Sequence, residues 1–134
     1  MSEIQKQPPE ERKRYVEGIA LFNQQRYFEA HEVWEDLWKR ADGNHKLFYQ
    51  GLIQCAVSLE HMKRGNASGA RSLFRRCQKR LAPLPPVYMG LDIWLLMEVT
   101  AKALAPGIDP PGKNAAAKEP DWPTIYLRKD LHTS

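Results

Sequence analysis

The chain consists of stretches in which apolar side chains recur every three or four residues, separated by short polar breaks. This spacing places the apolar side chains on one side of an α-helix. It predicts helices over about residues 10–24, 27–40, 45–64 and 93–104, and another, fourth in chain order, whose core face runs from Ala70 to Leu81. The helix at 45–64 is apolar nearly all round, so we expect it at the centre of the fold.

Residues that start or stop helices lie between these stretches. Pro8 and Pro9 are followed by acidic residues, which favours a helix start. Gly65 suits a helix C-terminus, and Asn66 or Ser68 suits the N-cap of the next helix. The other breaks are the turn at 41–44, the prolines at 83, 85 and 86, an N-cap at Asp92, and Pro106-Gly107, which should end the fifth helix.

The predicted buried faces are rich in aromatic side chains. The apolar stripe of the first helix consists of Tyr15, Val16, Ile19, Ala20 and Phe22. In the second helix, Trp34 and Trp38 fall in the apolar sector, and we expect both to be largely buried.

This order of elements predicts an all-α fold, a five-helix bundle made of two antiparallel helical hairpins and a closing helix. Small residues recur at similar places in the two hairpins, for example Gly18 and Gly51. Such residues resemble those at the close helix crossings of tetratricopeptide repeats. The spacings between matched positions differ, so we expect two degenerate hairpins that are only weakly tetratricopeptide-like.

The two ends of the chain differ from its centre. We expect a flexible N-terminus at 1–9, a helical domain at 10–104 and a Pro/Gly-rich extended tail at 105–134. The tail contains five prolines and two glycines and has no sustained period, which argues against regular structure. Its apolar residues Trp122, Ile125, Tyr126 and Leu127 are candidates for pinning it to the domain.

Composition narrows the class of protein. The longest purely apolar run covers five residues, from Ile93 to Met97, far below the roughly 20 needed to cross a bilayer. The first residues lack the apolar region of a signal peptide, so we expect a cytoplasmic protein with no membrane partner. Cys55 and Cys77 lie on apolar helical faces, where a free thiol acts as a small hydrophobic group, so we expect no disulfide.

The net charge of +4 comes from one region, because residues 63–82 contain seven basic residues and no acidic one. Five of these lie on the outer faces of the fourth helix: Arg71, Arg75, Arg76, Lys79 and Arg80. They predict either a solvated face, partly neutralised by neighbouring helices, or a surface for an anionic partner. Aromatic residues are not interleaved with these arginines, which argues against nucleic acid.

Residues 27–38 read Tyr-Phe-Glu-Ala-His-Glu-Val-Trp-Glu-Asp-Leu-Trp and follow Phe22 and Asn23. This segment resembles the signature of the family called domain of unknown function 309. The similarity continues through Gln50-Gly51-Leu52-Ile53-Gln54, His61, Gly65-Asn66, Gly69-Ala70 and the segment from Tyr88 to Asp92, and covers roughly residues 12–104. The resemblance implies a compact helical bundle without an assigned activity, so it supplies no reaction and no site residue.

Polar side chains on the second and third helices predict a buried polar seam. His31 points toward the core and Glu35 lies one turn further along, with Glu32 turned outward and Trp38 beside them. On the third helix the polar stripe consists of Gln50, Gln54, Ser58 and His61. An antiparallel hairpin would bring the two sets to the same level.

Three interpretations of this seam remain open. Hydrogen bonds could fix the register of two helices, or the polar groups and the walls formed by Trp34, Trp38 and Tyr49 could bind a small molecule or a peptide. Alternatively, His31 and Glu35 could start a metal or acid–base site, with Glu32 and His61 assisting. We favour a non-catalytic binding or interaction module, with an enzyme centred on His31 and Glu35 as the alternative. The sequence identifies no metal and no cofactor, and it does not predict the oligomeric state.

Overall fold

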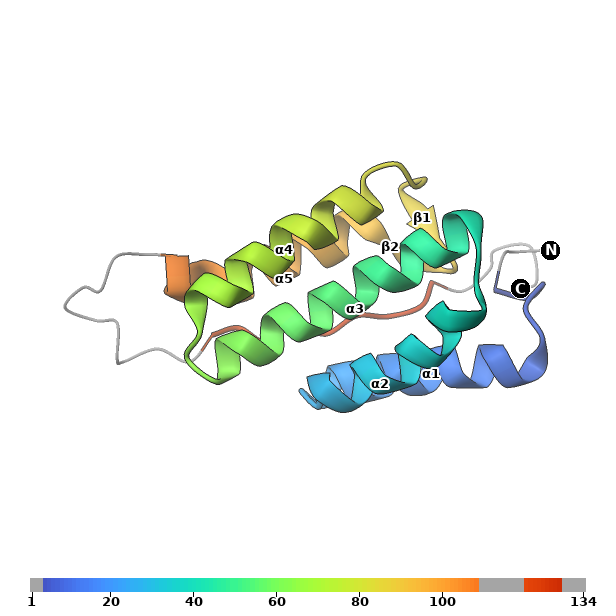
Figure 1. The fold of residues 1–134 in the computed structure, drawn as a ribbon, viewed down its shortest axis with the longest axis horizontal. Coiled ribbons are helices and arrows are strands. Elements are labelled where there is room, and N and C mark those ends of the chain that lie inside the picture. Colours follow the sequence, from blue (N-terminus) through green and yellow to red (C-terminus); the bar gives the residue numbers. More distant parts are fainter. Residues whose placement is uncertain (1–3, 109–119, 129–134) are drawn as a thin grey trace.

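The structure, a computed structural model, describes residues 4–108 and 120–128. Its helices are α1 (Pro9–Asn23), α2 (Tyr27–Arg40), α3 (Gly43–Lys63), α4 (Ala67–Leu81) and α5 (Ile93–Ile108). Two-residue strands, β1 (Val87–Tyr88) and β2 (Leu91–Asp92), pair antiparallel between α4 and α5 (Figure 1). The prediction of an all-α bundle is confirmed, since the sheet is no more than a tight hairpin.

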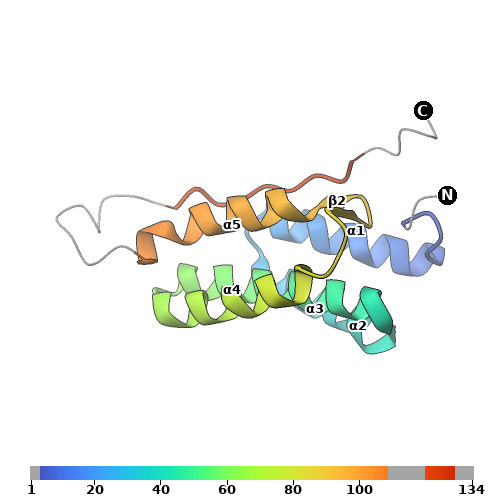
Figure 2. The ribbon, with the colours of Figure 1, turned by 90° about the horizontal axis from the view of Figure 1, so that it is seen from above.

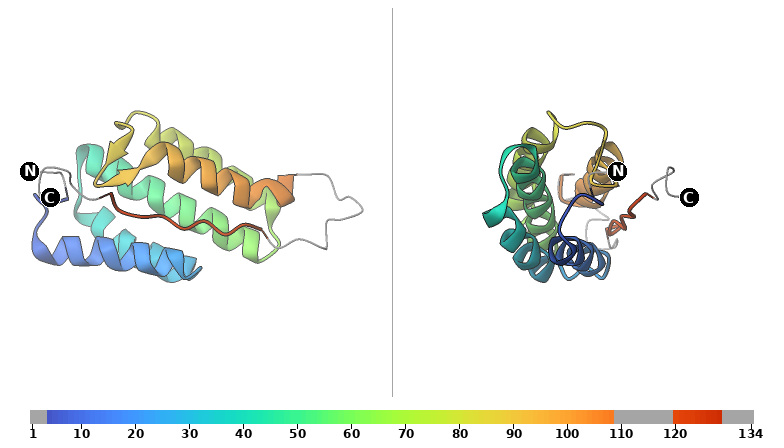
Figure 3. Two further views of the ribbon diagram at one scale, coloured as in Figure 1. Left: turned by 180° about the vertical axis from the view of Figure 1, so that it is seen from behind. Right: turned by 90° about the vertical axis from the view of Figure 1, so that its right-hand side faces the viewer.

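Each of the first four helices packs against the next one, and α5 packs on α4 and α3. Helix α3 lies in the centre and contacts α2, α4 and α5, as its all-round apolar surface predicts. Seen from above, α2, α3 and α4 lie to one side of the molecule, and α5 and residues 120–128 lie to the other (Figure 2). Residues 120–128 are extended and run lengthwise over α3 between α1 and α5 (Figure 3).

The helices approach most closely at two glycines. A Cβ atom on Gly18 would lie 2.1 Å from Nε1 of Trp34, and one on Gly51 would lie 2.5 Å from Cδ2 of Leu81. Only a residue without a side chain fits there, because both neighbouring side chains are fully buried. The small residues of the two hairpins therefore do stand at close helix crossings.

An aromatic cluster forms the core on the α1 side. The side chains of Tyr15, Phe22, Tyr27, Trp34 and Phe48 are fully buried and meet mostly edge to face. Two of these aromatic side chains also form hydrogen bonds. Nε1 of Trp34 donates to the carbonyl of Tyr15 at 3.3 Å, and the Tyr15 hydroxyl donates to the carbonyl of Met89 at 2.9 Å. These bonds tie α1 to α2 and to the β1–β2 turn.

Two predicted core positions on α1 are wrong. Val16 is 45% exposed and Ala20 is also exposed. Helix α1 packs mainly on α2, and the contact passes through Gly18, so its buried side follows residues 15, 18, 19 and 22. Trp34 is fully buried as expected, whereas Trp38 is only partly buried.

The predicted helix ends are largely confirmed. Asn66 caps α4 by accepting a hydrogen bond from the backbone N–H of Gly69, and Asp92 accepts one from Leu95 at the start of α5. Gly65 has a positive φ of 79° after the C-cap of α3. The end of α5 is different, because the helix continues through Pro106 to Ile108. A proline has a helical φ, so its position near a helix end removes one donor without forcing the helix to stop.

The short hairpin at 87–92 was not anticipated from the sequence. Gly90 has a φ of 75° and Met89 a φ of 52°, so both turn residues adopt the left-handed conformation that such turns require. The non-glycine residue Met89 hides this turn from a search for Asn-Gly or Gly-Gly pairs. Within residues 4–108 and 120–128, the helices are too short or too polar to span a bilayer.

Candidate functional site

The predicted polar seam begins on α2 with His31 and Glu35. Nε2 of His31 lies 2.9 Å from Oε2 of Glu35, and Nδ1 of His31 lies 3.3 Å from the carbonyl oxygen of Phe28. The His31 side chain is 21% exposed and that of Glu35 is 40% exposed. Lys39, one turn beyond Glu35, lies 3.8 Å from its other carboxylate oxygen. These contacts all lie within α2, and Glu32 is exposed to solvent.

The α3 members also bond within their own part of the chain. The Ser58 hydroxyl donates to the carbonyl of Cys55 at 2.6 Å, and Nδ1 of His61 lies 2.9 Å from Nδ2 of Asn66. Oε1 of Gln54 is buried without a hydrogen-bond partner, and Gln50 is partly buried. Among the described residues, no hydrogen bond joins His31 or Glu35 to either glutamine.

Trp38 contacts α3 through Lys46, whose ammonium group donates to the Trp38 carbonyl at 3.4 Å, and not through the polar stripe of α3. Its Nε1 is buried without a partner, and the ammonium group of Lys46 lies 4.6 Å from its ring. The structure thus places the predicted seam residues on adjacent helices without linking them through hydrogen bonds. In the two described ranges, no group of three or more His, Cys, Asp or Glu side chains could hold a metal ion. A ligand at the seam stays a prediction.

The basic residues of α4 lie where the sequence places them. Arg75, Arg76 and Lys79 are exposed, and Arg71 and Arg80 are partly buried. Nε of Arg80 is buried without a hydrogen-bond partner. An anionic partner for this face stays a prediction.

A different arrangement, absent from the predicted sites, joins the end of α1 to the segment 120–128. The side-chain amide of Asn23, the last residue of α1, forms two hydrogen bonds with the backbone of Ile125. Nδ2 of Asn23 donates to the Ile125 carbonyl at 2.8 Å, and the Ile125 N–H donates to Oδ1 of Asn23 at 2.8 Å. One side chain thus satisfies both backbone polar groups of one residue in an extended segment.

The segment 120–128 presents alternate side chains to the domain. Pro123 and Ile125 are buried and Leu127 is partly buried, whereas the intervening Thr124 and Tyr126 are exposed. This alternation is that of a β-strand with one face covered. The pinning predicted for Ile125 and Leu127 is therefore confirmed, but Tyr126 is 75% exposed and does not contribute to it.

Contacts at both ends of the segment fix its position. The ring of Trp122 packs on that of Tyr27, with centroids 6.0 Å apart, and the N–H of Arg128 donates to the carbonyl of Gly90 at 2.7 Å. Tyr27 is fully buried, and this burial, with smaller contributions from Cys55 and Glu60, raises the pKa of its hydroxyl. The surface beneath residues 120–128, marked by Asn23, Tyr27 and Gly90, is called the docking surface below.

Sequence reasoning did not find Asn23 as a site residue. The signal was present, because Asn23 is a polar residue next to the buried Phe22 and lies within the segment that resembles a known family. Its partner, however, lies 102 residues away, and no local pattern connects the two positions.

Fold and site together define a helical bundle with an extended segment seated along one side. The model of the family described as "Domain of unknown function (DUF309)" matches residues 15–73 of this chain, which agrees with the resemblance seen in the sequence. That match runs from α1 into α4 and includes Asn23, Tyr27 and His31, but not α5 or the segment 120–128.

Relatives in other organisms are similar to this chain over parts of their length. The uncharacterized protein YpuF of Bacillus subtilis is 40% identical over 63 residues, which are 46% of this chain and 36% of YpuF. An uncharacterized protein of Aquifex aeolicus is 26% identical over 78 residues, 58% of this chain and 23% of that protein. The chain thus spans well under half of either relative.

A solved structure shares the fold. The crystal structure of the conserved hypothetical protein TTHA0068 from Thermus thermophilus superposes with a TM-score of 0.63 at 32% identity. The superposition covers 68% of this chain and 95% of the Thermus chain.

Proposed function

We propose that this chain is a non-catalytic interaction module whose docking surface binds an extended peptide segment. The observation that carries the proposal is the double hydrogen bond between the Asn23 amide and the backbone of Ile125. A side-chain amide that bonds both the N–H and the C=O of one peptide residue recognises the extended backbone of the peptide and does not contact that residue's side chain. It therefore suits a peptide of variable sequence.

Side-chain specificity would come from the alternating apolar contacts. Pro123 and Ile125 are buried and Leu127 is partly buried, so a peptide with apolar residues at alternate positions would fit in the same way. Main-chain bonds give such complexes their affinity, and pockets for alternate side chains give them selectivity. In the structure the chain's own residues 120–128 occupy the docking surface, so a peptide from a partner would have to compete with a tethered segment.

The alternative, an acid–base or metal-dependent enzyme, has less support. It rests on His31 and Glu35, whose 2.9 Å contact is that of an i, i+4 ion pair on one helix. Neither residue is hydrogen-bonded to the polar stripe of α3 in the described chain, so the imidazole contacts only groups of its own helix, Glu35 and the Phe28 carbonyl. The peptide proposal explains more of the observed contacts.

The test uses the full chain with Ile125→Asp, which places a carboxylate at a site that is 4% exposed and should release the tethered segment. A fluorescent peptide with the sequence of residues 120–128 is then titrated and its anisotropy measured. We expect saturable binding to this variant and much weaker binding to the unsubstituted chain, whose own segment competes.

A second substitution in the same background isolates the amide. Asn23→Asp keeps the size of the side chain but cannot donate to the peptide carbonyl and repels it, so binding should weaken about tenfold or more. Gln24→Glu, the same change at the exposed next residue, is the matched control and should leave affinity unchanged. Equal affinity of the Asn23→Asp and Gln24→Glu variants, or no binding by a folded Ile125→Asp chain, would contradict the proposal.

A further inference from the structure

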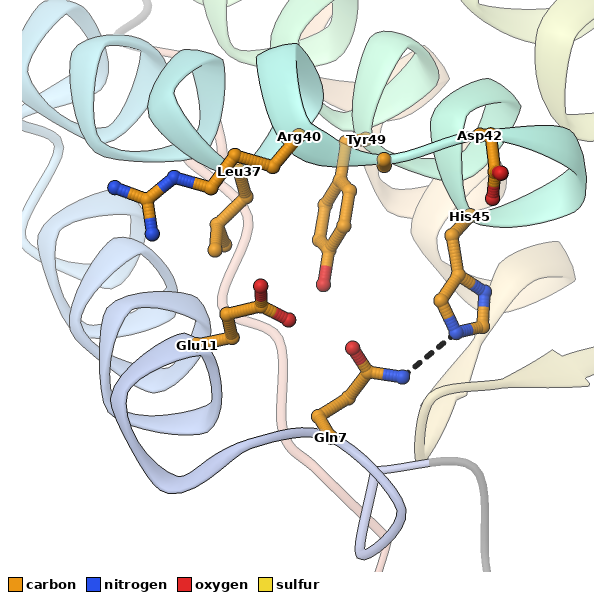
Figure 4. Close-up of a pocket in the computed structure, with 8 residues that line it drawn as sticks. Gln7, Glu11, Leu37, Arg40, Asp42, His45 and Tyr49 are labelled. Carbon is orange, nitrogen blue, oxygen red and sulfur yellow. Dashed lines mark hydrogen bonds between the residues drawn. The ribbon is translucent and has the colours of Figure 1, made fainter.

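A small cavity lies apart from the docking surface, where the start of α1 faces the turn between α2 and α3. It encloses about 130 Å³ and is lined by Gln7, Glu11, Leu37, Arg40, Ala41, Asp42, His45 and Tyr49 (Figure 4). For comparison, an engineered apolar cavity of about 150 Å³ holds one benzene molecule. The space therefore admits a ligand of about half a dozen heavy atoms. Unlike that cavity, it is lined largely by polar side chains.

The Tyr49 hydroxyl group points into this cavity without a hydrogen-bond partner. Tyr49 is 3% exposed, and its oxygen is a buried polar atom that the protein leaves unsatisfied. Figure 4 shows the hydroxyl directed at the open space between Glu11 and Gln7. Burial, together with the nearby charges of Glu11 and Tyr88, raises the pKa of Tyr49, so the group remains a neutral hydroxyl. An unsatisfied buried hydroxyl is costly unless something in the cavity bonds to it.

The groups around the hydroxyl are mainly acceptors. Gln7 uses its amide nitrogen in a 2.7 Å hydrogen bond with Nε2 of His45, and its carbonyl oxygen faces the cavity. The Glu11 carboxylate also points inward, and it forms no hydrogen bond or ion pair within the described residues.

The cationic side chain at the rim does not neutralise Glu11. The Arg40 guanidinium group lies 3.3 Å from the carboxylate of Asp36 and points away from the cavity in Figure 4. A carboxylate, an amide oxygen and a hydroxyl oxygen thus converge on one small space. This set requires a ligand that donates several hydrogen bonds and carries positive charge.

We propose that this cavity binds a primary ammonium group, with its three N–H donors directed to Glu11, Gln7 and Tyr49. A compact ammonium group matches three acceptors, and Leu37 and Ala41 offer apolar contact to a short alkyl chain. The ligand is a small free amine or the side chain of a lysine. This site shares no residue with the docking surface, so the ammonium proposal and the peptide proposal are tested independently.

The experiment titrates the full-length chain with methylammonium chloride at pH 7 and follows amide chemical shifts by ¹H–¹⁵N NMR, with potassium chloride at equal ionic strength as the reference. We expect saturable shifts at residues 7, 11 and 49 with methylammonium only. n-Butylammonium, which mimics a lysine side chain, is titrated in parallel. Tighter binding of n-butylammonium assigns the site to lysine side chains, and tighter binding of methylammonium assigns it to small free amines.

Three variants test the residues. Glu11→Gln should weaken binding about tenfold or more because a charge-assisted bond is lost, and Tyr49→Phe should weaken it several-fold. Glu10→Gln, the same change at the exposed preceding residue, should bind as the unsubstituted chain does. Thermal unfolding of each variant verifies that it is folded. Shifts no different from those in potassium chloride, or equal affinity of the Glu11→Gln and Glu10→Gln variants, would overturn the proposal.

Discussion

Single residues set the distances between the helices. Gly18 allows the ring of Trp34 to lie against the α1 backbone, and Gly51 does the same for Leu81 against α3. Asn23 acts differently, since it fixes an extended segment through backbone groups alone. The two glycines and the asparagine differ chemically, but each is required because of what lies opposite it.

Gly18→Ala should destabilise the fold. The new methyl group would lie 2.1 Å from Nε1 of Trp34, and the fully buried ring could move aside only by losing its hydrogen bond to the Tyr15 carbonyl. Overpacking costs about 1 to 3 kcal/mol, and the helix propensity of alanine offsets at most about 1 kcal/mol. The expected net loss is about 1 to 2 kcal/mol in the free energy of unfolding, measured in urea.

Ala20→Ser is the control, because it adds one heavy atom at an exposed position of the same helix. It should cost no more than about 0.5 kcal/mol. A Gly18→Ala chain as stable as this control would show that Trp34 does not pack against α1 as described.

At the scale of elements, turn residues and caps explain where the helices begin and end. Asn66 and Asp92 were both recognisable as caps, and Gly65 as a helix terminator, because these effects depend on neighbours in sequence. What the sequence did not reveal depends on distant neighbours. Val16 is exposed because no described residue covers that side of α1, and Asn23 is a site residue because Ile125 reaches it.

The cap at the start of α4 can be tested against the alternative that the sequence left open. Asn66→Ala removes the side-chain oxygen that bonds the N–H of Gly69 and should lower the free energy of unfolding by about 1 kcal/mol. Ser68→Ala, at the other candidate cap, should have almost no effect because Ser68 is exposed and lies inside the helix. Thermal or urea unfolding measures both. A larger loss at Ser68 than at Asn66 would place the helix start elsewhere.

At the scale of the whole molecule, all five described helices contribute to the core. The reactivity of the two buried thiols measures how readily this core opens. Cys55 in α3 and Cys77 in α4 are both free, and they are 1% and 0% exposed. A hydrogen bond with Cys55, and then burial, raise the pKa of the Cys77 thiol well above its usual range. Since the thiolate is the reactive form, neither property favours reaction in the native state.

Both thiols should therefore react with a disulfide reagent such as dithionitrobenzoate only when the domain opens. For a domain of ordinary stability, labelling at pH 8 should be about a thousandfold or more slower than in the urea-unfolded chain. Native and unfolded chains labelled at similar rates would mean that α3 and α4 separate easily.

The bundle, its helix order and the match to a known family model could be predicted from sequence because they follow from local periodicity and a contiguous motif. The candidate site could not be predicted from the sequence, for a physical reason. The docking surface combines the end of α1, the start of α2 and the β1–β2 turn, and the segment that covers it follows all of them in the chain. The apolar side chain of Ile125 indicates contact with some part of the domain, but it does not indicate which polar side chain satisfies the backbone of Ile125.

Residues 120–128 follow all five described helices, and this order has a consequence for synthesis on the ribosome. Translation proceeds from the N-terminus, and domains generally fold as units as they emerge. The five helices that carry the docking surface are therefore made before the segment that covers it. Asn23 is therefore made before Ile125 can bond to it, and the proposed peptide would meet no internal competitor during that interval.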